Sequence, residues 1–228
     1  MLVSLGIHAQ VDRTTMPEPG PAPKINLKDA ERFDLPNGLT VLVVENHKLP
    51  RVSAQLTLDN PPIFEGDKAG VASLTGSLLG NGSKNISKDE FNEEIDFMGA
   101  TLSFSSQSAY GSSLTKYFPR LMELMADAAI NPNFTQEEFD KERDKLITGL
   151  KTSEKSASAI ASRVQRALAY GKGHPYGEFT TEETVNNVTL ADVGRFYNDY
   201  FVPANAYLIV IGDTDVKQVK GLVEKYFS

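Results

Sequence analysis

The stretch Gly70–Ser83, which reads GVASLTGSLLGNGS, decides the fold of this 228-residue chain. Its apolar residues recur at the spacing of a helix with one buried face (Val71, Leu74, Leu78). Ser73 and Ser77 lie four residues apart, so they share another face of that helix. The stretch contains no histidine, cysteine, aspartate or glutamate. It therefore predicts a helix without a metal ligand or a charged base.

Apolar alternation predicts strands on both sides of this helix. Strands are expected over 33–45 and 51–59, around the turn signal Asn37-Gly38, with a strand pair at 101–106 and 109–115. The near-continuous apolar run at 206–211 is typical of a central strand buried on both faces. Strands first, helices in the middle, then a strand and a helix predict an α+β fold. We expect a mostly antiparallel sheet with helices packed on one face.

Helix ends carry their own signals. Ser87 is followed by Glu90, and Thr189 by Asp192, which is the pattern of a capping hydroxyl and an acid three residues later. Gly99 follows an apolar helical run, as glycines at helix ends do. These signals predict the start of two helices and the end of one.

Composition is that of an ordinary globular protein, with 40% hydrophobic and 23% charged residues. The net charge of −7 and the absence of a basic run argue against a nucleic-acid partner, because binding to phosphates needs clustered Lys and Arg. No window of about 20 apolar residues occurs, so no transmembrane helix is predicted. Cysteine is absent, which excludes disulfides and a thiolate zinc site.

The first 25 residues differ from the rest. Residues 1–10 are apolar and end near a small residue, which is typical of the tail of a secretory signal peptide; a disordered leader is the alternative. Prolines alternate between positions 17 and 23, as in an extended linker. We expect 1–25 to be a signal-peptide remnant and a Pro-rich linker, disordered up to about Lys24, and 26–228 to be a single α+β domain. The expected location is exported: periplasmic, or membrane-associated on the outer side.

Six short blocks occur in an informative order: Phe33–Val41, Glu65–Ala72, Phe97–Ala100, His174–Gly177, Phe196–Asn205 and Ala206–Asp213. These blocks and their order resemble those of the pitrilysin/insulinase family of zinc metallopeptidases, and the resemblance runs from about Glu31 to the last residue. The resemblance implies a domain like those of pitrilysin and the mitochondrial processing peptidase. Family members usually carry two such units, so the resemblance also implies that 26–228 is the first half of a longer subunit.

In that family a helix with the motif H-x-x-E-H supplies two zinc-binding histidines and a glutamate that activates water. The resemblance places these positions on Ser73, Gly76 and Ser77. A serine hydroxyl is a poor zinc ligand, and glycine has no side chain to act as a base. The third ligand, a glutamate of a later helix, falls on Thr148 or Gly149. The resemblance therefore implies a member with no catalytic residues, no metal ligands and no zinc cofactor.

Leu102-Ser103-Phe104-Ser105 resembles the strand on which family members pair an extended peptide through backbone hydrogen bonds. An exposed sheet edge can add a strand whatever its side chains are. By this resemblance the chain is an inactive subunit or domain, comparable to the silent subunit of the mitochondrial processing peptidase, and not an enzyme on its own. It would form a heterodimer with an active zinc-bearing subunit of the same family and help to bind peptide substrates.

Two other functions stay open. A stand-alone peptide-binding or scaffold protein would need no peptidase partner, and copurification with an H-x-x-E-H relative separates it from the first hypothesis. An active metallopeptidase with relocated ligands would need clustered ligands. The three histidines, His8, His47 and His174, lie outside helical ligand spacing and favour turn or surface roles.

If this chain keeps the backbone of the family, the positions that lack the zinc ligands and the base should accept the family's side chains. Histidines in place of Ser73 and Ser77, with glutamates in place of Gly76 and Gly149 or Thr148, are expected to create zinc affinity. The glycine replacements are expected to be tolerated, because glycine is the costly residue inside a helix.

Overall fold

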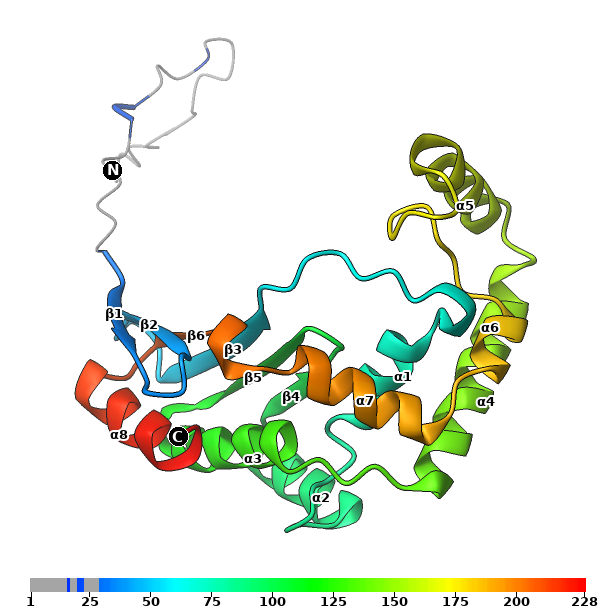
Figure 1. Cartoon of the computed structure of the whole chain (residues 1–228). Helices are drawn as coiled ribbons and strands as arrows, with labels where there is room; N and C mark the ends of the chain where they lie inside the picture. The colour runs from blue at the N-terminus through cyan, green and yellow to red at the C-terminus, as the bar shows by residue number, and fades with distance from the viewer. Residues whose placement is uncertain (1–15, 17–19, 23–28) are drawn as a thin grey trace, which may run out of the picture.

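The computed structural model describes residues 16, 20–22 and 29–228. The prediction for the leader and linker, 1–25, falls almost entirely outside these residues. Figure 1 shows a sheet at one end of the molecule, helices beneath and beside it, and one helix that stands away from the rest.

Six strands of the described chain form one mixed sheet in the order β1-β2-β6-β3-β5-β4. The neighbours β2 and β6 run parallel, and the other four pairs are antiparallel, so the predicted α+β fold with a mostly antiparallel sheet is confirmed. The turn between β1 and β2 uses Gly38 at φ 93°, a conformation that favours glycine. The strands are β1 (Glu31–Asp34), β2 (Thr40–Glu45), β3 (Arg51–Leu58), β4 (Thr101–Phe104), β5 (Ser108–Leu114) and β6 (Ala206–Gly212).

Helices fill the connections between these strands. The predicted capping boxes at Ser87 and Thr189 are confirmed, and Gly99 ends its helix at φ 56°. None of the helices in the described part of the chain is long and apolar enough to cross a lipid bilayer. The helices are α1 (Val71–Leu78), α2 (Lys88–Met98), α3 (Phe118–Ile130), α4 (Gln136–Ser153), α5 (Ala157–Tyr170), α6 (Glu182–Asn186), α7 (Leu190–Tyr200) and α8 (Val216–Tyr226), with 3₁₀ turns η1 (Gly66–Lys68), η2 (Thr115–Tyr117) and η3 (Pro203–Asn205).

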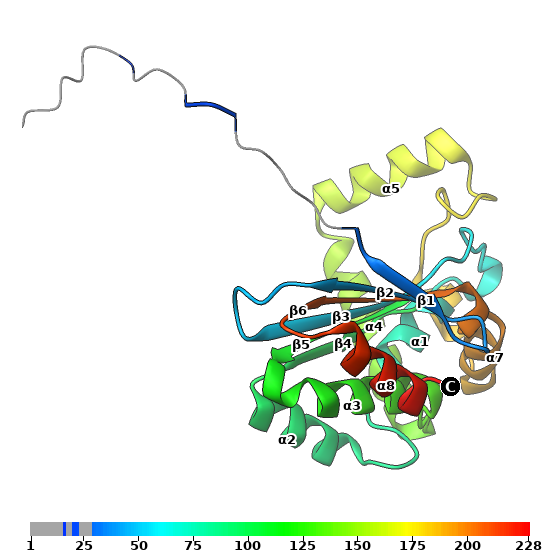
Figure 2. The ribbon, with the colours of Figure 1, turned by 90° about the vertical axis from the view of Figure 1, so that its left-hand side faces the viewer.

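The main core lies under one face of the sheet. Alternate residues of β2, β3 and β6 point toward α3 and α8, which lie below the sheet in Figure 2. Helix α2 packs against α3 from the far side. The largest side chains of this core are fully buried: Phe118, Leu121, Met122, Met125 and Leu208. Burial of this apolar surface is the dominant favourable term in folding.

A second core joins the helices beyond the sheet. Apolar residues of α1, α4, α6 and α7 meet in one cluster, so these four helices form a unit beside the sheet (Figure 1). Phe139 of α4 and Val193 of α7 are at most 1% exposed and lie at its centre. This cluster fixes the position of α1, the helix that the sequence singled out.

The upper face of the sheet is open. In β6, Leu208 and Val210 are fully buried, whereas Tyr207 is 38% and Ile211 is 44% exposed. The predicted central position of this strand is confirmed, but its predicted burial on both faces is wrong. Helices of the described chain pack on one side of the sheet, and an apolar run by itself does not say whether the second side is covered.

Helix α5 lies outside both cores. None of its residues is buried. It stands away from the sheet on the side of the open face (Figures 1 and 2).

Candidate functional site

Helix α1 packs its apolar side onto the second core. Val71, Leu74 and Leu78 are buried against residues of α4, α6 and α7. Ser73 and Ser77 lie on the opposite side and are exposed, as their spacing predicted. The two predicted motif positions therefore share one solvent-facing surface, where a hydroxyl is the only side-chain chemistry that they supply.

Two carboxylates hold the beginning of α1. Glu65 Oε2 accepts hydrogen bonds from the backbone N–H groups of Gly70 (2.8 Å) and Ala72 (3.1 Å). Glu178 accepts from the backbone N–H groups of Glu65 (3.0 Å) and Gly66 (2.6 Å). Burial raises the pKa of Glu65, and the nearby Glu178 charge adds to that rise, while the backbone hydrogen bonds oppose it. Glu65 thus fixes the start of the helix, and Glu178, which is distant in sequence, holds the turn that carries Glu65.

An ion pair with a buried carboxylate ties the same region to α7. Lys68 Nζ lies 2.5 Å from Oδ1 of Asp192, whose side chain is 6% exposed. Asp192 Oδ2 accepts from Thr189 N (2.9 Å) and Thr189 Oγ1 (2.6 Å). Burial raises the pKa of Asp192, but the hydrogen bonds from Lys68 and Thr189 outweigh it and lower the pKa to about 2. The carboxylate therefore stays charged and acts as a structural anchor.

Gly76 meets the turn between β4 and β5. A Cβ atom at this position would lie 2.5 Å from Ser106 N and 2.8 Å from the carbonyl carbon of Ser105. The turn is held by a hydrogen bond from Ser105 N to Ser108 O (2.7 Å). Real Cβ atoms do not approach backbone so closely, so the expectation that glutamate is tolerated at position 76 is wrong. The reason is tertiary contact, which outweighs helix propensity.

Helix α4 supplies the other predicted positions. It packs against α1, as its apolar residues join the second core. Thr148 and Gly149 are both exposed, and Thr148 Oγ1 donates to the backbone oxygen of Asp144 within its own helix (2.8 Å). A Cβ at Gly149 would meet nothing within 4 Å. The structure thus brings the two helices together, and position 149, unlike position 76, has room for a side chain.

Strand β4 is an edge of the sheet and ends at α1. It pairs with β5 on one side, and the ring of Phe104 lies against Gly80, just beyond α1. The predicted strand at 101–106 is two residues shorter in the structure. The segment Leu102–Ser105 and helix α1 therefore lie side by side.

The hydrogen-bonding direction of β4 follows from its turn. Ser105 N donates to Ser108 O, so Ser105 faces β5. Antiparallel ladders alternate, which makes Ser103, opposite Tyr110, face β5 as well. The backbone groups of Leu102 and Phe104 then point outward from the edge. Those two residues offer the N–H and C=O groups that an added strand would use.

Metal-binding side chains do not gather elsewhere in the described residues, where no three of His, Cys, Asp and Glu are placed to hold an ion. His47 Nδ1 lies 2.8 Å from Asp213 Oδ1 at the surface. His174 stacks on Tyr170 at a ring distance of 5.6 Å. His8 lies outside the described residues.

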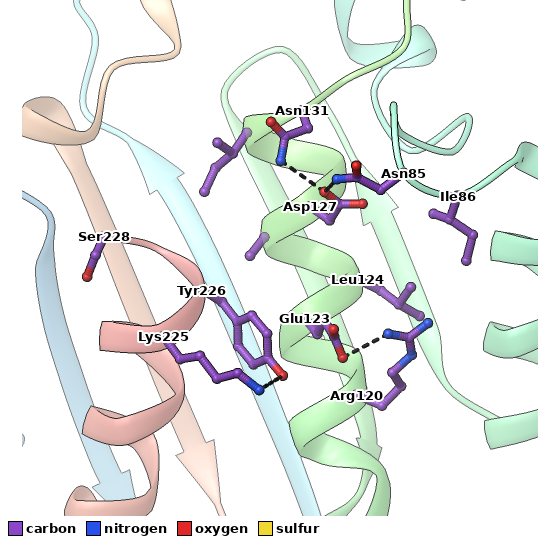
Figure 3. Close-up of a pocket in the computed structure, with 12 residues that line it drawn as sticks. Asn85, Ile86, Arg120, Glu123, Leu124, Asp127, Asn131, Lys225, Tyr226 and Ser228 are labelled. Atoms are coloured by element: carbon purple, nitrogen blue, oxygen red, sulfur yellow. Dashed lines mark hydrogen bonds and ion pairs between the residues drawn. The ribbon is translucent and has the colours of Figure 1, made fainter.

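A groove of about 510 Å³ opens between α3 and α8, on the helical side of the sheet (Figure 3). Its polar side chains pair with one another. Arg120 binds Glu123 at 2.8 Å, Lys225 donates to the hydroxyl of Tyr226 at 2.9 Å, and Asp127 accepts from Asn131 at 2.9 Å. The groove therefore presents satisfied groups and adds nothing to the site at α1 and β4.

Sequence comparison decides the family. The family model described as Insulinase (Peptidase family M16) matches residues 40–175. The chain belongs to this family. A second family model, described as Peptidase M16 inactive domain, matches residues 187–228.

Relatives of this insulinase-family chain include subunits of larger complexes. Cytochrome b-c1 complex subunit 1 of Bos taurus is 25% identical over 210 residues, which cover 89% of this chain and 43% of the relative. The probable mitochondrial-processing peptidase subunit beta of Schizosaccharomyces pombe is 24% identical over 214 residues, 89% of this chain and 46% of the relative. The chain thus spans less than half the length of these relatives.

Structural comparison agrees with the fold. The crystal structure of the periplasmic protease PqqL from Escherichia coli superposes with a TM-score of 0.74 at 22% identity, over 91% of this chain and 24% of that chain. At this identity the likeness concerns the fold alone. It supports the α+β assignment independently of any motif.

The family's zinc does not fit the residues present here. Ser73 and Ser77 offer neutral hydroxyls in place of imidazoles. The base position, Gly76, is closed by backbone. No step of a metal-dependent reaction can be assigned to these side chains.

Several residues that shape the site were not identified from sequence. Glu65 and Glu178 lie 113 positions apart, and no periodicity connects them. Asp192 was recognised only as a helix cap, whereas the structure also gives it the ion pair with Lys68. The sequence marked Gly76 only as a position without the family's glutamate. The structure shows that its close contact with the backbone of Ser105 and Ser106 requires a glycine there.

Matched glycine substitutions test the closed position. Gly76→Ala should lower the free energy of unfolding by about 1–3 kcal/mol, because the new methyl overlaps backbone atoms of the β4–β5 turn. Gly149→Ala, in open space on α4, should raise it by up to about 1 kcal/mol through helix propensity. Urea unfolding of both variants gives the two values. Equal effects of the two substitutions would contradict the contact at Gly76.

The Lys68–Asp192 pair should make stability depend on acid pH. Because the pKa of Asp192 is lowered to about 2, its contribution is complete above the unfolded pKa of about 3.8 and disappears as the pH falls through about 2. Asp192→Asn should lose about 2 kcal/mol at pH 7, with the deficit shrinking between about pH 4 and 2. Exposed Asp199→Asn on the same helix should change stability by less than about 0.5 kcal/mol. A pH-independent deficit in Asp192→Asn would show that the anchor is not electrostatic.

Proposed function

We propose that this chain is a non-catalytic member of the insulinase family that holds extended peptides on β4 beside α1. One observation carries the proposal: α1 is kept in place by Glu65, Glu178 and the Lys68–Asp192 pair, while its base position is closed by the backbone of the β4–β5 turn. Helix α1 and strand β4 are held firmly in place, whereas the site has no side chain that suits a zinc ligand or a general base. That combination suits binding rather than cleavage.

The edge of β4 supports the binding part of the proposal. The outward backbone groups of Leu102 and Phe104 can add a peptide strand without any demand on its sequence. Ser103 and Ser105 contribute small exposed side chains, which leave space for the side chains of a bound peptide. The expected substrates are therefore unfolded or extended peptides.

We further propose that a zinc-bearing subunit of the same family performs the cleavage and that this chain holds no zinc of its own. The relatives support an assembly, since their names describe subunits of a cytochrome b-c1 complex and of a mitochondrial processing peptidase. A stand-alone peptide-binding scaffold is the alternative, and it predicts the same β4 contacts without the partner. A peptidase with relocated ligands is disfavoured by the lack of clustered ligands in the described residues.

An exported, periplasmic or outer-side location is part of the proposal. The apolar stretch 1–10 supports it, as does the likeness in fold to a protein described as periplasmic.

Strand addition on β4 can be tested with a proline and its matched control. Leu102→Pro removes the outward N–H and should weaken binding of a fluorescent unfolded peptide about five- to tenfold, the value of roughly one hydrogen bond. Leu102→Ala loses the same side-chain packing but keeps the N–H, so its affinity should stay near that of the parent. Fluorescence anisotropy gives both constants. Equal weakening by the two variants would place the peptide elsewhere.

Purification from the native organism tests the assembly. A tagged chain should copurify with an H-x-x-E-H protein, and metal analysis should find zinc in the complex but not in the chain alone, since Ser73, Ser77 and Gly76 provide no ligand set. The complex should cleave peptides that the isolated chain only binds. Stoichiometric zinc on the purified chain would refute the non-catalytic assignment, and repeated recovery of the chain without such a partner would favour the scaffold.

A further inference from the structure

The chain contains two asparagines that are followed directly by glycine, Asn37-Gly38 and Asn81-Gly82. In such a pair the backbone nitrogen of the glycine can attack the side-chain amide carbon of the asparagine, because a glycine has no side chain that shields its nitrogen. The attack is intramolecular, so it depends on how freely the two groups can approach each other. The structure gives the two pairs different surroundings.

The pair Asn37-Gly38 is locked by hydrogen bonds. Gly38 N donates to the backbone oxygen of Leu35 (3.0 Å). Asn37 Nδ2 donates to the backbone oxygen of Phe227 (2.6 Å), and Asn37 Oδ1 accepts from Leu39 N (3.2 Å). The attacking nitrogen and the amide that would leave are therefore both held, and these bonds must break before the two groups can react.

The pair Asn81-Gly82 lacks most of these restraints. The N–H of Gly82 is buried and has no acceptor among the residues that the structure describes. A buried N–H without a partner is unfavourable, and no hydrogen bond holds this nitrogen away from the neighbouring side chain. The side chain of Asn81 is partly exposed, so water can reach it, and it makes one hydrogen bond, from Nδ2 to the backbone oxygen of Ser77 (3.2 Å).

We propose that Asn81 deamidates spontaneously in the folded protein. The Gly82 nitrogen forms a bond to Cγ of Asn81, the Cγ–Nδ2 bond breaks, and the Gly82 proton leaves with the amide as ammonia. Water then opens the five-membered imide at one of its two carbonyl groups, which leaves an aspartate or an isoaspartate at position 81. Water is the only co-reactant. The modification goes beyond the proposed function and does not depend on it.

The amide that is lost holds the end of α1. This helix ends at Leu78, and Asn81 Nδ2 donates to the backbone oxygen of Ser77 in its last turn. A carboxylate cannot donate this bond, and a negative charge is unfavourable at the C-terminal end of a helix dipole. Gly80 of the same loop lies against the ring of Phe104 on β4. Deamidation therefore loosens the last turn of α1 at the place where its loop meets the edge strand.

Peptide mapping by mass spectrometry measures the modification while the folded chain is incubated at neutral pH. Trypsin releases Asn81 in the peptide 69–84, which holds no other asparagine or glutamine, and Asn37 in the peptide 33–48. Asn81 should deamidate about tenfold faster than Asn37, because the Asn37 pair must break more hydrogen bonds before it reacts. In urea, which removes the fold, the two pairs should react at similar rates.

Substitutions test the effect on α1. In Asn81→Asp, the amide hydrogens at the end of α1 should exchange with solvent about three- to tenfold faster than in the parent, through the lost hydrogen bond and the unfavourable charge. Asn92→Asp adds the same charge at an exposed position of α2 and should leave this exchange unchanged. Asn81→Gln keeps an amide but would have to close a larger ring, so the peptide 69–84 should stay unmodified. Circular dichroism verifies that each variant folds.

Either of two results would overturn the proposal. If Asn81 in the folded chain reacts no faster than Asn37, or stays intact while the chain in urea deamidates, the free N–H of Gly82 does not make this pair reactive. If Asn81→Asp and Asn92→Asp leave the exchange at the end of α1 equally unchanged, the amide of Asn81 does not hold the helix.

Discussion

The contact between α1 and the β4–β5 turn sets the arrangement of the whole molecule. Gly76 lets the helix backbone approach Ser105 and Ser106 more closely than any side chain permits. Through this contact the second core, which holds α1, α4, α6 and α7 together, is joined to the end of the sheet. The edge strand β4, helix α1 and the helical unit then keep one fixed geometry, so the edge of the sheet has a rigid neighbour.

Charged groups do a different job from the apolar cores. Burial of apolar surface supplies most of the favourable free energy of folding, but it does not determine the residue at which a helix begins. Glu65 and Glu178 fix that start through directional hydrogen bonds to backbone N–H groups, and Lys68 with Asp192 fixes α7 beside them. The carboxylates near α1 therefore fix where the helix lies.

Local signals allowed much of the fold to be predicted. Alternation, the turn at Asn37-Gly38 and the capping residues Ser87 and Thr189 depend on near neighbours, so the elements could be placed from sequence. The open face of β6 could not be predicted, because an apolar strand has the same sequence pattern whether one or both of its faces are covered. Nor could the crowding at Gly76: residues 76 and 105 meet only after the chain has folded. Motif comparison singled out position 76 for the side chain that it lacks and could not show which residues it touches.

The turn against Gly76 also restricts the sequences that this fold can accept. A glutamate at this position would lower stability at once, and its benefit would depend on histidines at 73 and 77 that are absent as well. Each single substitution toward an H-x-x-E-H helix is therefore unfavourable or without effect until the others, and a shifted turn, are in place. The backbone against Gly76 therefore opposes a gain of that motif by single substitutions, because a side chain at position 76 costs stability and none of the substitutions alone completes a ligand set.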